Sequence, residues 1–418
     1  MFEIASVSAL EILDSRARPT LAVTVTLAGG APVRAGVPSG ASTGSREAAE
    51  RRDGDPARFW GQGVRGAVAA VSGEISDAVC GRHFADQAAL DVALIALDGT
   101  TDKHRLGANA IVGVSMAVAR ALAQQENRAL WQSLRRAGAT PRLPVPHFNV
   151  VNGGAHAPNA LDFQEFMLAP LGAPSVAEAI RAGAEIYARL RAELAGLGHA
   201  VGLGDEGGFA PEIARPEDVC RVLVRAIEAA GYEPGRRGVA LALDPAASEF
   251  FSDGRYRVDG ESLTSGELVE RYCELVDAYP IWSLEDGLGE SDWQGWRQLA
   301  DRLGERIQLV GDDILVTNPA IIAEAIEQKI ANAALIKLNQ IGTVTETLHA
   351  MQLCRDAGWA QMVSHRSGET EDTFIADLAV ASGCGQLKSG APARGERVAK
   401  YNRLIEIEAE SGRPYGLG

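Results

Sequence analysis

Six short apolar runs in the second half of the chain each end at a chargeable side chain. The runs are VALALD, IWSLED, IQLVGDD, ALIKLN, QMVSHRS and GQLKSG. A short apolar run bounded by turn residues is typical of a buried parallel strand. The side chains at their ends are Asp244, Glu285, Asp312, Lys337, His365 and Lys388. Because parallel strands end at the same edge of a sheet, we expect these side chains to gather in one active site.

The spacing of the runs predicts a (β/α)8-type barrel. Successive runs lie roughly 25 to 40 residues apart, about the repeat expected when eight strand and helix units fill roughly 250 residues. Between them, Ser262 to Tyr279 has apolar residues at helical spacing, and Asn318-Pro319 is typical of a helix start. Gly358 is placed to end a helix over 343–357. Strand alternating with helix indicates the α/β class.

The first third of the chain has a different pattern. Leu21 to Leu27 alternates apolar and polar positions, which predicts a half-buried strand of a small antiparallel sheet. Residues 67–79 and 109–123 carry apolar stripes at helical spacing. We therefore expect a smaller α+β capping domain over 1–138, with a mobile Ser/Gly loop, ahead of the barrel over 139–418. Prolines at 141, 144 and 146 mark the boundary.

Composition and charge narrow the partners. The chain has 418 residues, is 46% hydrophobic, and carries 55 acidic against 40 basic residues, a formal net charge of -15. That balance argues against nucleic acid or an anionic membrane as the main partner. The five cysteines form no C-x-x-C pair, no signal peptide is visible, and no run approaches the roughly 20 apolar residues of a membrane span. We expect a cytoplasmic protein.

Three carboxylates at one barrel mouth need a counter-ion. Asp244, Glu285 and Asp312 would repel one another by several kcal/mol at an intermediate dielectric, about 4 kcal/mol per pair at 4 Å. Oxygen ligands without cysteine favour a hard cation such as Mg2+. Each acid alone could instead cap a helix or pair with an arginine, but three acids in register favour the metal.

The neighbouring residues complete a set of groups for elimination. Lys337 and Lys388, partly desolvated beside a cation, would have lowered pKa values and could act as bases. His365 to Gly368 offers an imidazole, a guanidinium and a hydroxyl that could hold a phosphate. Acids occur in Gly204 to Phe209 and in Phe163 to Phe166, which we expect to end another strand. Base, acid, metal and phosphate cradle together favour a β-elimination.

The sequence resembles the enolase family over nearly its whole length. The matching motifs, in family order, include SGASTG, RLGANAIVGVS, NGGAHA, FQEFM, GDEGGFAP, LDPAASEFF, SLEDGL, VGDDILVTN, IKLNQIGT, SHRSGETEDTFIADL and LKSGAPARGERVAKYN. The resemblance implies Mg2+-dependent, reversible dehydration of a small anionic substrate, 2-phosphoglycerate, to phosphoenolpyruvate. It also implies a homodimer or an octamer.

The resemblance further implies three groups of site residues. The first Mg2+ would be bound by Asp244, Glu285 and Asp312, and a second Mg2+, arriving with substrate, by Ser42. The C2 proton would be removed by Lys337. Loss of the C3 hydroxyl would be assisted by Glu206, Glu165 and His156. The substrate would be held by Gln164, His365, Arg366, Ser367 and Lys388.

Two alternative functions stay open. One is an enolase-like dehydratase that makes carboxyphosphonoenolpyruvate from a 2-phosphoglycerate analogue in phosphonate biosynthesis. The other is a non-catalytic enolase-fold binding or structural protein, against which the presence of Lys337 and Glu206 argues. Departures from the family pattern, which could alter loop dynamics, dimer contacts or the substrate, are Ala17, Arg18, Pro158, Trp282, Gly395 and Glu406.

Overall fold

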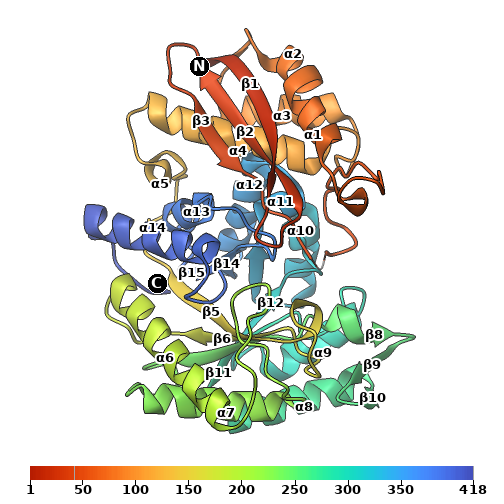
Figure 1. Ribbon diagram of the computed structural model, residues 1–418, viewed down its shortest axis with the longest axis vertical. Coiled ribbons are helices and arrows are strands. Elements are labelled where there is room, and N and C mark those ends of the chain that lie inside the picture. Colours follow the sequence, from red (N-terminus) through yellow and green to blue (C-terminus); the bar gives the residue numbers. More distant parts are fainter. Residues whose placement is uncertain (42, 418) are drawn as a thin grey trace.

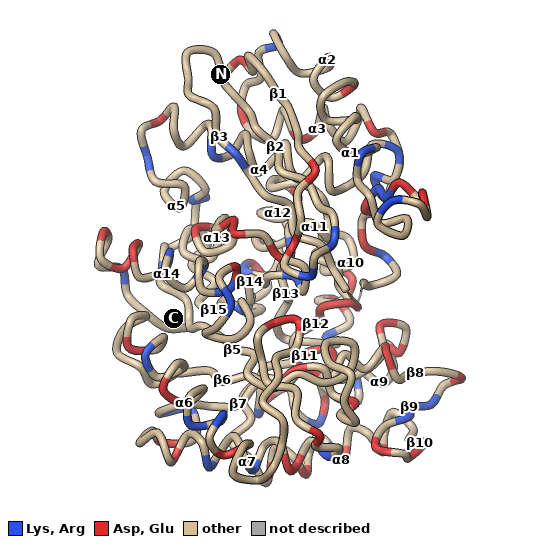
Figure 2. Tube along the Cα trace, viewed as in Figure 1, with Lys and Arg blue, Asp and Glu red and all other residues tan. Residues whose placement is uncertain are grey.

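The computed structural model describes residues 1–41 and 43–417 in two parts (Figure 1). The upper part in Figure 1 holds a small sheet with helices against it, and the lower part is a closed barrel ringed by helices. Basic and acidic positions are interspersed over both parts (Figure 2). Within the described residues, no helix is both long enough and apolar enough to cross a membrane.

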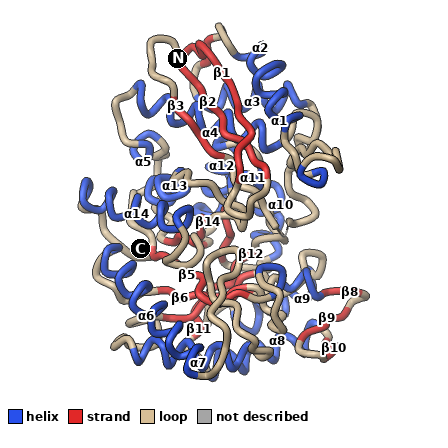
Figure 3. The backbone as a smooth tube through the Cα atoms, viewed as in Figure 1, coloured by secondary structure: helices blue, strands red, loops and turns tan. Residues whose placement is uncertain are grey.

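The N-terminal sheet is antiparallel, as predicted, with strand order β3-β2-β1-β4. Figure 3 shows β3, β2 and β1 side by side. Its strands are β1 (Phe2–Leu13), β2 (Pro19–Leu27), β3 (Val33–Gly36) and β4 (His83–Phe84). Leu21, Val23 and Val25 of β2 are fully buried, because they face the helices rather than solvent. The main helices of this part are α1 (Arg65–Ala70), α2 (Ser76–Val79), α3 (Gln87–Asp98), α4 (Ala108–Gln125) and α5 (Leu130–Ser133). A π-helical segment, Val71–Ile75, joins α1 to α2.

All six predicted strands are present and run parallel to one another in the barrel. They are β7 (Ala240–Asp244), β11 (Ile281–Glu285), β12 (Gln308–Gly311), β13 (Ala333–Ile336), β14 (Ala360–Ser364) and β15 (Gln386–Lys388). Two further strands, β5 (Val145–Asn152) and β6 (Glu165–Ala169), close it in the order β11-β12-β13-β14-β15-β5-β6-β7.

One strand of the barrel is antiparallel to both of its neighbours. β6 pairs with β5 and with β7 in antiparallel register, and Glu165 stands opposite Asp244. The prediction that Phe163 to Phe166 ends a strand was therefore wrong, since Glu165 is the first residue of β6. The acid still reaches the active rim, because the reversed strand has its amino end where the parallel strands have their carboxyl ends.

Helices surround the barrel, and several of them begin at a capping side chain. They are α6 (Val176–Gly196), α7 (Pro216–Ala229), α8 (Ser265–Ala278), α9 (Trp293–Leu303), α10 (Pro319–Gln328), α11 (Leu338–Ile341), α12 (Val344–Asp356), α13 (Phe374–Ser382) and α14 (Gly395–Ser411). The Asn318 side chain caps α10 as predicted, and Gly358, with φ at 72°, follows α12. α8 begins at Ser265 rather than Ser262, because Thr264 and Glu267 form a capping box.

Residues 261–263 form β10 (Glu261–Leu263) instead of helix. β10 belongs to a separate three-stranded sheet with β8 (Phe251–Ser252) and β9 (Arg255–Val258). This sheet projects from the barrel at the lower right of Figure 1.

Contacts at the start of α12 join the two parts. The Asp91 carboxylate on α3 accepts hydrogen bonds from the Thr345 amide and hydroxyl, and Lys103 pairs with Glu346 at 3.0 Å. The loop after β3 also reaches the barrel, since the Ala48 amide donates to the Gln340 carbonyl. The N-terminal part therefore delivers a loop to the rim where the parallel strands end.

Candidate active site

The predicted strand-end side chains lie together at the carboxyl rim of the barrel. Asp244, Glu285 and Lys388 are the last residues of β7, β11 and β15. Asp312, Lys337 and His365 directly follow β12, β13 and β14. Lys337 is half-buried and the other five side chains are buried.

Five of these six side chains line one narrow cavity of about 20 Å3. Eleven of the thirteen residues predicted for the site take part, together with Ser364. The lining residues are His156, Gln164, Glu165, Glu206, Asp244, Asp312, Lys337, Ser364, His365, Arg366, Ser367 and Lys388. Glu285 lies directly behind, 2.8 Å from the Lys388 ammonium. Of the two predicted residues that are not in the lining, Glu285 contacts it, and Ser42 lies outside the described residues.

Lys388 is held by three carboxylates. Its Nζ lies 3.0 Å from Asp244 Oδ2, 2.8 Å from Glu285 Oε1 and 2.9 Å from Glu165 Oε2. Burial alone would lower the pKa of Lys388, but these acids outweigh it and raise the pKa well above its ordinary value. Lys388 is therefore an ammonium suited to holding an anion.

Lys337 is held in a similar way by one acid. Its Nζ lies 2.5 Å from Asp312 Oδ2. Burial acts to lower the pKa of Lys337, while the Asp312 carboxylate acts to raise it, and the net direction is upward. The sequence predicted lowered pKa values for Lys337 and Lys388, but the neighbouring side chains raise both. Lys337 can act as a base only when another cation neutralises the Asp312 carboxylate, because this charge then no longer raises the pKa of Lys337.

The acids around Lys337 and Lys388 form a buried, all-oxygen donor set. Burial and the neighbouring Asp244 raise the pKa of Glu285 well above its ordinary range. Glu285 Oε2 has no hydrogen-bond partner among the described residues. Acids that crowd in this way, with a carboxylate oxygen left over, fit a hard divalent cation such as Mg2+, which would neutralise them.

Two further aspartates support this set and were missed from the sequence. The Asp286 carboxylate accepts the backbone N–H groups of Asp312 and Asp313, at 2.8 and 2.9 Å. Ligand atoms of these three residues all lie within 4.8 Å of one another. Burial, followed by the Asp312 charge, raises the pKa of Asp313 to about 8. The signal was present in the doubled acids of SLED and VGDD, where the second acid of each pair was not interpreted.

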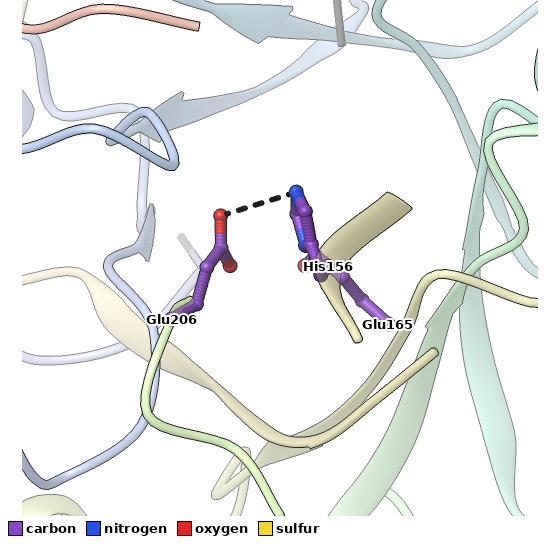
Figure 4. A group of neighbouring side chains, drawn as sticks. All are labelled: His156, Glu165 and Glu206. Atoms are coloured by element: carbon purple, nitrogen blue, oxygen red, sulfur yellow. Dashed lines mark ion pairs between the residues drawn. The ribbon is translucent and has the colours of Figure 1, made fainter. Parts of the chain in front are cut away.

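His156, Glu165 and Glu206 form a second group in the cavity lining (Figure 4). His156 lies between two glutamates, with Nδ1 3.6 Å from Glu165 Oε1 and Nε2 3.8 Å from Glu206 Oε1. Asn149 donates to Glu206 Oε2 at 2.9 Å, and His365 Nε2 lies 3.2 Å from the same oxygen. The two glutamates therefore have different neighbours.

Those neighbours push the two glutamate pKa values apart. Burial and the nearby Glu206 charge raise the pKa of Glu165 well above its ordinary value. Burial acts in the same direction on Glu206, but His365, His156 and Arg397 lower its pKa well below the ordinary value. Two neighbouring carboxyl groups with pKa values shifted apart in this way share one proton, and the raised pKa of Glu165 favours Glu165 as its carrier.

Arg366 and Ser367 contribute hydrogen-bond donors to the cavity lining. Glu47, from the loop after β3, accepts from both Arg366 Nη atoms at 2.9 and 3.1 Å. Arg366 also donates to Asn339 Oδ1 at 3.1 Å, and Arg16 donates to Ser367 Oγ at 3.2 Å. Two guanidinium groups and a hydroxyl thus meet here, as a phosphate requires. Glu47 was missed because its partner lies 319 positions away.

The six departures from the family pattern all lie outside the cavity lining. Ala17 and Arg18 form an exposed turn after β1, Pro158 is exposed, and Gly395 begins α14. Glu406 pairs with Arg403 on α14. Trp282 lies near the amino end of β11, where its ring centroid is 5.5 Å from that of His147.

Comparison with known proteins gives one consistent result. Two family models match, "Enolase, N-terminal domain" over residues 4–134 and "Enolase, C-terminal TIM barrel domain" over residues 140–415. A protein named "Enolase" from Rubrobacter xylanophilus is 56% identical over 414 residues, which cover 99% of this chain and 96% of the relative. "Enolase" of Acidothermus cellulolyticus is 56% identical over 410 residues, covering 98% and 95%. "Enolase 1" of Methylococcus capsulatus is 54% identical over 419 residues, covering 99% of both chains.

Proposed function

The chain belongs to the enolase family, and we propose that its barrel site interconverts 2-phosphoglycerate and phosphoenolpyruvate, a glycolytic reaction, with the side chains described above. It is a hydro-lyase of the phosphopyruvate hydratase type that uses Mg2+. Relatives named enolase at 54–56% identity do not favour the phosphonate alternative. They also give the non-catalytic alternative no support.

One observation carries the proposal. Lys337, Glu165 and Glu206 line a single cavity, and the pKa values of the two glutamates are shifted in opposite directions. A base and an acid on opposite faces of a substrate are what removal of a C2 proton and loss of a C3 hydroxyl require. Guanidinium groups at one end supply the phosphate site.

Lys337 is the proposed base. The C2 proton passes to Nζ of Lys337, and the electron pair left behind is delocalised into the substrate carboxylate. When bound at Asp244, Glu285 and Asp312, Mg2+ supplies positive charge that lets these carboxylates ionise together and stabilises negative charge on the substrate. Lys388 and Gln164 hold the carboxylate side of the substrate.

Glu165 and Glu206 act on the leaving group. The proton carried by this pair passes to the C3 oxygen as the C–O bond breaks, so the group leaves as water. His156, which lies within 3.8 Å of both glutamates, orients the leaving oxygen. Arg366 and Ser367, beside His365, bind the phosphate. Ser42 would hold the second Mg2+.

The proposal is tested by an absorbance assay. Purified protein with Mg2+ and 2-phosphoglycerate should show rising ultraviolet absorbance as phosphoenolpyruvate forms. Lys337→Ala should lower kcat by about 10²- to 10⁴-fold, the range for loss of a general base. Lys329→Ala, which changes a lysine outside the cavity lining, serves as the matched control. A folded, Mg2+-binding protein that leaves 2-phosphoglycerate unchanged would overturn the proposal.

We also propose that the protein works as a homodimer, or as an octamer built from dimers, in the cytoplasm. Large apolar side chains are exposed on β1 and in the loop paired with it through Arg58 and Glu11: Leu10 is 65% exposed, Leu13 57% and Trp60 88%. Such a patch is typical of an interface. Light scattering should give a dimer or larger species, and Leu10→Glu should shift it toward monomer.

The five cysteines support the cytoplasm as the compartment. All five are described, and all are free thiols, which fits a reducing compartment.

A further inference from the structure

Arg397 is a fully buried arginine that does not line the cavity. It projects from α14, and its guanidinium donates to the carbonyl oxygens of Arg366 and Ser367, both at 2.6 Å. It also reaches Ser15 Oγ and the Asp205 carbonyl, each at 3.3 Å. One side chain thereby joins the loop after β14, the loop that carries Glu206, and the N-terminal part.

Arg397 makes one contact that bears on chemistry. Its Nη1 lies 2.5 Å from His365 Nδ1. A guanidinium has donors and no acceptor, so His365 Nδ1 must be the acceptor and cannot carry a proton. Burial lowers the pKa of His365 to about 3, so the ring is neutral. The single ring proton is therefore on Nε2.

That proton lies beside Glu206. His365 Nε2 is 3.2 Å from Glu206 Oε2, but among the described residues it has no hydrogen-bond partner in the resting geometry. Asn149 donates to the same oxygen at 2.9 Å. The hydrogen bond from Asn149 and the neighbouring N–H group of His365 both favour an unprotonated Oε2. Glu206 Oε1, 3.8 Å from His156 Nε2, is the oxygen left to face the reacting groups.

We infer that Arg397 is a positioning residue that fixes His365 as the Nε2–H tautomer and so assigns Glu206 Oε2 to hydrogen bonding and Oε1 to the reaction. The inference rests on the proposed function only in calling Oε1 reactive. The tautomer itself is a property of the resting protein. Arg397 does not touch substrate, and it acts through His365.

The first test is made on the wild-type protein. Nitrogen-15 NMR of histidine-labelled protein distinguishes the two ring nitrogens, and a His365→Gln variant assigns the resonance among the seven histidines. We expect His365 Nδ1 to be unprotonated and Nε2 protonated at neutral pH. A proton on Nδ1, or on both nitrogens, would overturn the inference whatever the activity. Conversely, an inactive enzyme with the expected tautomer would refute the proposed function alone.

The second test uses substitution. Arg397→Lys removes the fork of donors and should give a mixture of His365 tautomers, with kcat lowered by about 100-fold, the typical cost of misplacing a reacting group by 1 Å. Arg394→Lys is the matched control, because Arg394 donates to the Ser15 and Gly204 carbonyls but not to His365. The control should keep the wild-type tautomer. An unchanged tautomer in Arg397→Lys would refute the role of Arg397, and the wild-type spectrum still decides if that variant fails to fold.

Discussion

Ala17 occupies a backbone conformation that suits glycine. It lies in the turn between β1 and β2 with φ at 57°, and the Asp14 carboxylate accepts the amides of Arg16 and Arg18 on either side. The turn therefore keeps its shape although a Cβ stands in the left-handed region. A residue with a Cβ is disfavoured there by about 1 to 2 kcal/mol.

Ala17→Gly should therefore stabilise the protein. The greater freedom of glycine in the unfolded chain offsets part of the gain, so we expect a net increase of roughly 0.5 to 1 kcal/mol in the free energy of unfolding. Urea unfolding measures it. Ala192→Gly, at an exposed position inside α6, should instead destabilise by about 1 kcal/mol. Equal losses in both variants would show that Ala17 is not strained.

Glu47 is an anion already bound where the substrate phosphate is proposed to bind. Its carboxylate pairs with both Arg366 Nη atoms, and its side chain is 9% exposed. Glu47→Gln should tighten inhibition by inorganic phosphate about 10-fold, because like charges at short range repel by more than the ~1.4 kcal/mol that this factor needs. Competitive inhibition of the absorbance assay gives the constant.

Glu50→Gln controls for general effects on this loop. Glu50 pairs with Arg52 and Ser39, and its charge raises the pKa of Arg366 less than the charge of Glu47 does. Its substitution should leave the phosphate inhibition constant within about 2-fold, the usual range for a surface charge. Weaker phosphate binding in Glu47→Gln would mean that Glu47 orients Arg366 rather than competing with the anion.

At the scale of elements, strand positions were predictable but one strand direction was not. The six apolar runs predicted their strands because buried parallel strands are apolar throughout. The residues of β6 are equally apolar, yet apolar pattern does not encode direction. The prediction placed Glu165 at the correct rim of the barrel, but it took Glu165 for the end of a strand, whereas Glu165 is the start of β6. Only the pairing of β6 with β5 and β7 shows that the strand is reversed.

Supporting residues were missed for a related reason. Arg397 and Glu47 act through partners on other elements, and a single sequence does not show which residues those partners are. Arg397 and His365 are 32 positions apart, while Glu47 and Arg366 are 319 apart. Side chains at strand ends could be predicted because topology alone brings them together.

Asp91 joins α3 to α12 and should give stability a pH dependence. Burial raises the pKa of this carboxyl to about 6, despite hydrogen bonds from Thr345, Ser115 and Gln87 that act to lower it. The folded state therefore binds the proton more tightly than the unfolded state. This stabilisation is complete below the unfolded pKa of about 4 and is lost as pH rises through about 6.

Asp91→Asn should remove that dependence. One pH unit below the folded pKa, protonation of Asp91 adds about 1.4 kcal/mol to the free energy of unfolding relative to alkaline pH. The variant should lack this difference. Urea unfolding at about pH 5 and about pH 7.5 measures the difference. Thr345→Val keeps the carboxyl but removes a hydroxyl donor, so it should raise the pKa of Asp91 and move the transition to higher pH. Parallel pH profiles for wild type and Asp91→Asn would contradict this assignment.

At the scale of the whole molecule, both parts contribute to the site. Among the described residues, the barrel supplies all those that line the cavity, while Glu47 and Arg16 come from the N-terminal part and contact Arg366 and Ser367. The loop that carries Glu47 packs closely on the barrel. A Cβ at Gly44 would lie 2.6 Å from Val316 Cγ1. Glu47 thus joins this loop to Arg366, the proposed phosphate ligand.

The charge of the buried rim makes overall stability depend on Mg2+. Acids there outnumber the cations Lys337, Lys388 and Arg366; the acids are Glu165, Glu206, Asp244, Glu285, Asp286, Asp312 and Asp313. A cation that binds the folded protein alone stabilises it by about 2.7 kcal/mol at 100 times its Kd. Calorimetry should therefore show Tm rising with Mg2+ and falling back when a chelator is added, whereas NaCl at matched ionic strength should not reproduce the rise.

A pair of isosteric variants separates this site from general charge effects. Asp312→Asn removes one proposed ligand and should lose most of the Mg2+-dependent rise in Tm. Asp301→Asn removes an exposed carboxylate on α9 and should keep the full rise. Because both variants change net charge by the same amount, a difference between them can come only from where the charge lies. Equal responses to Mg2+ in the two variants would place the stabilising ion somewhere other than the barrel rim.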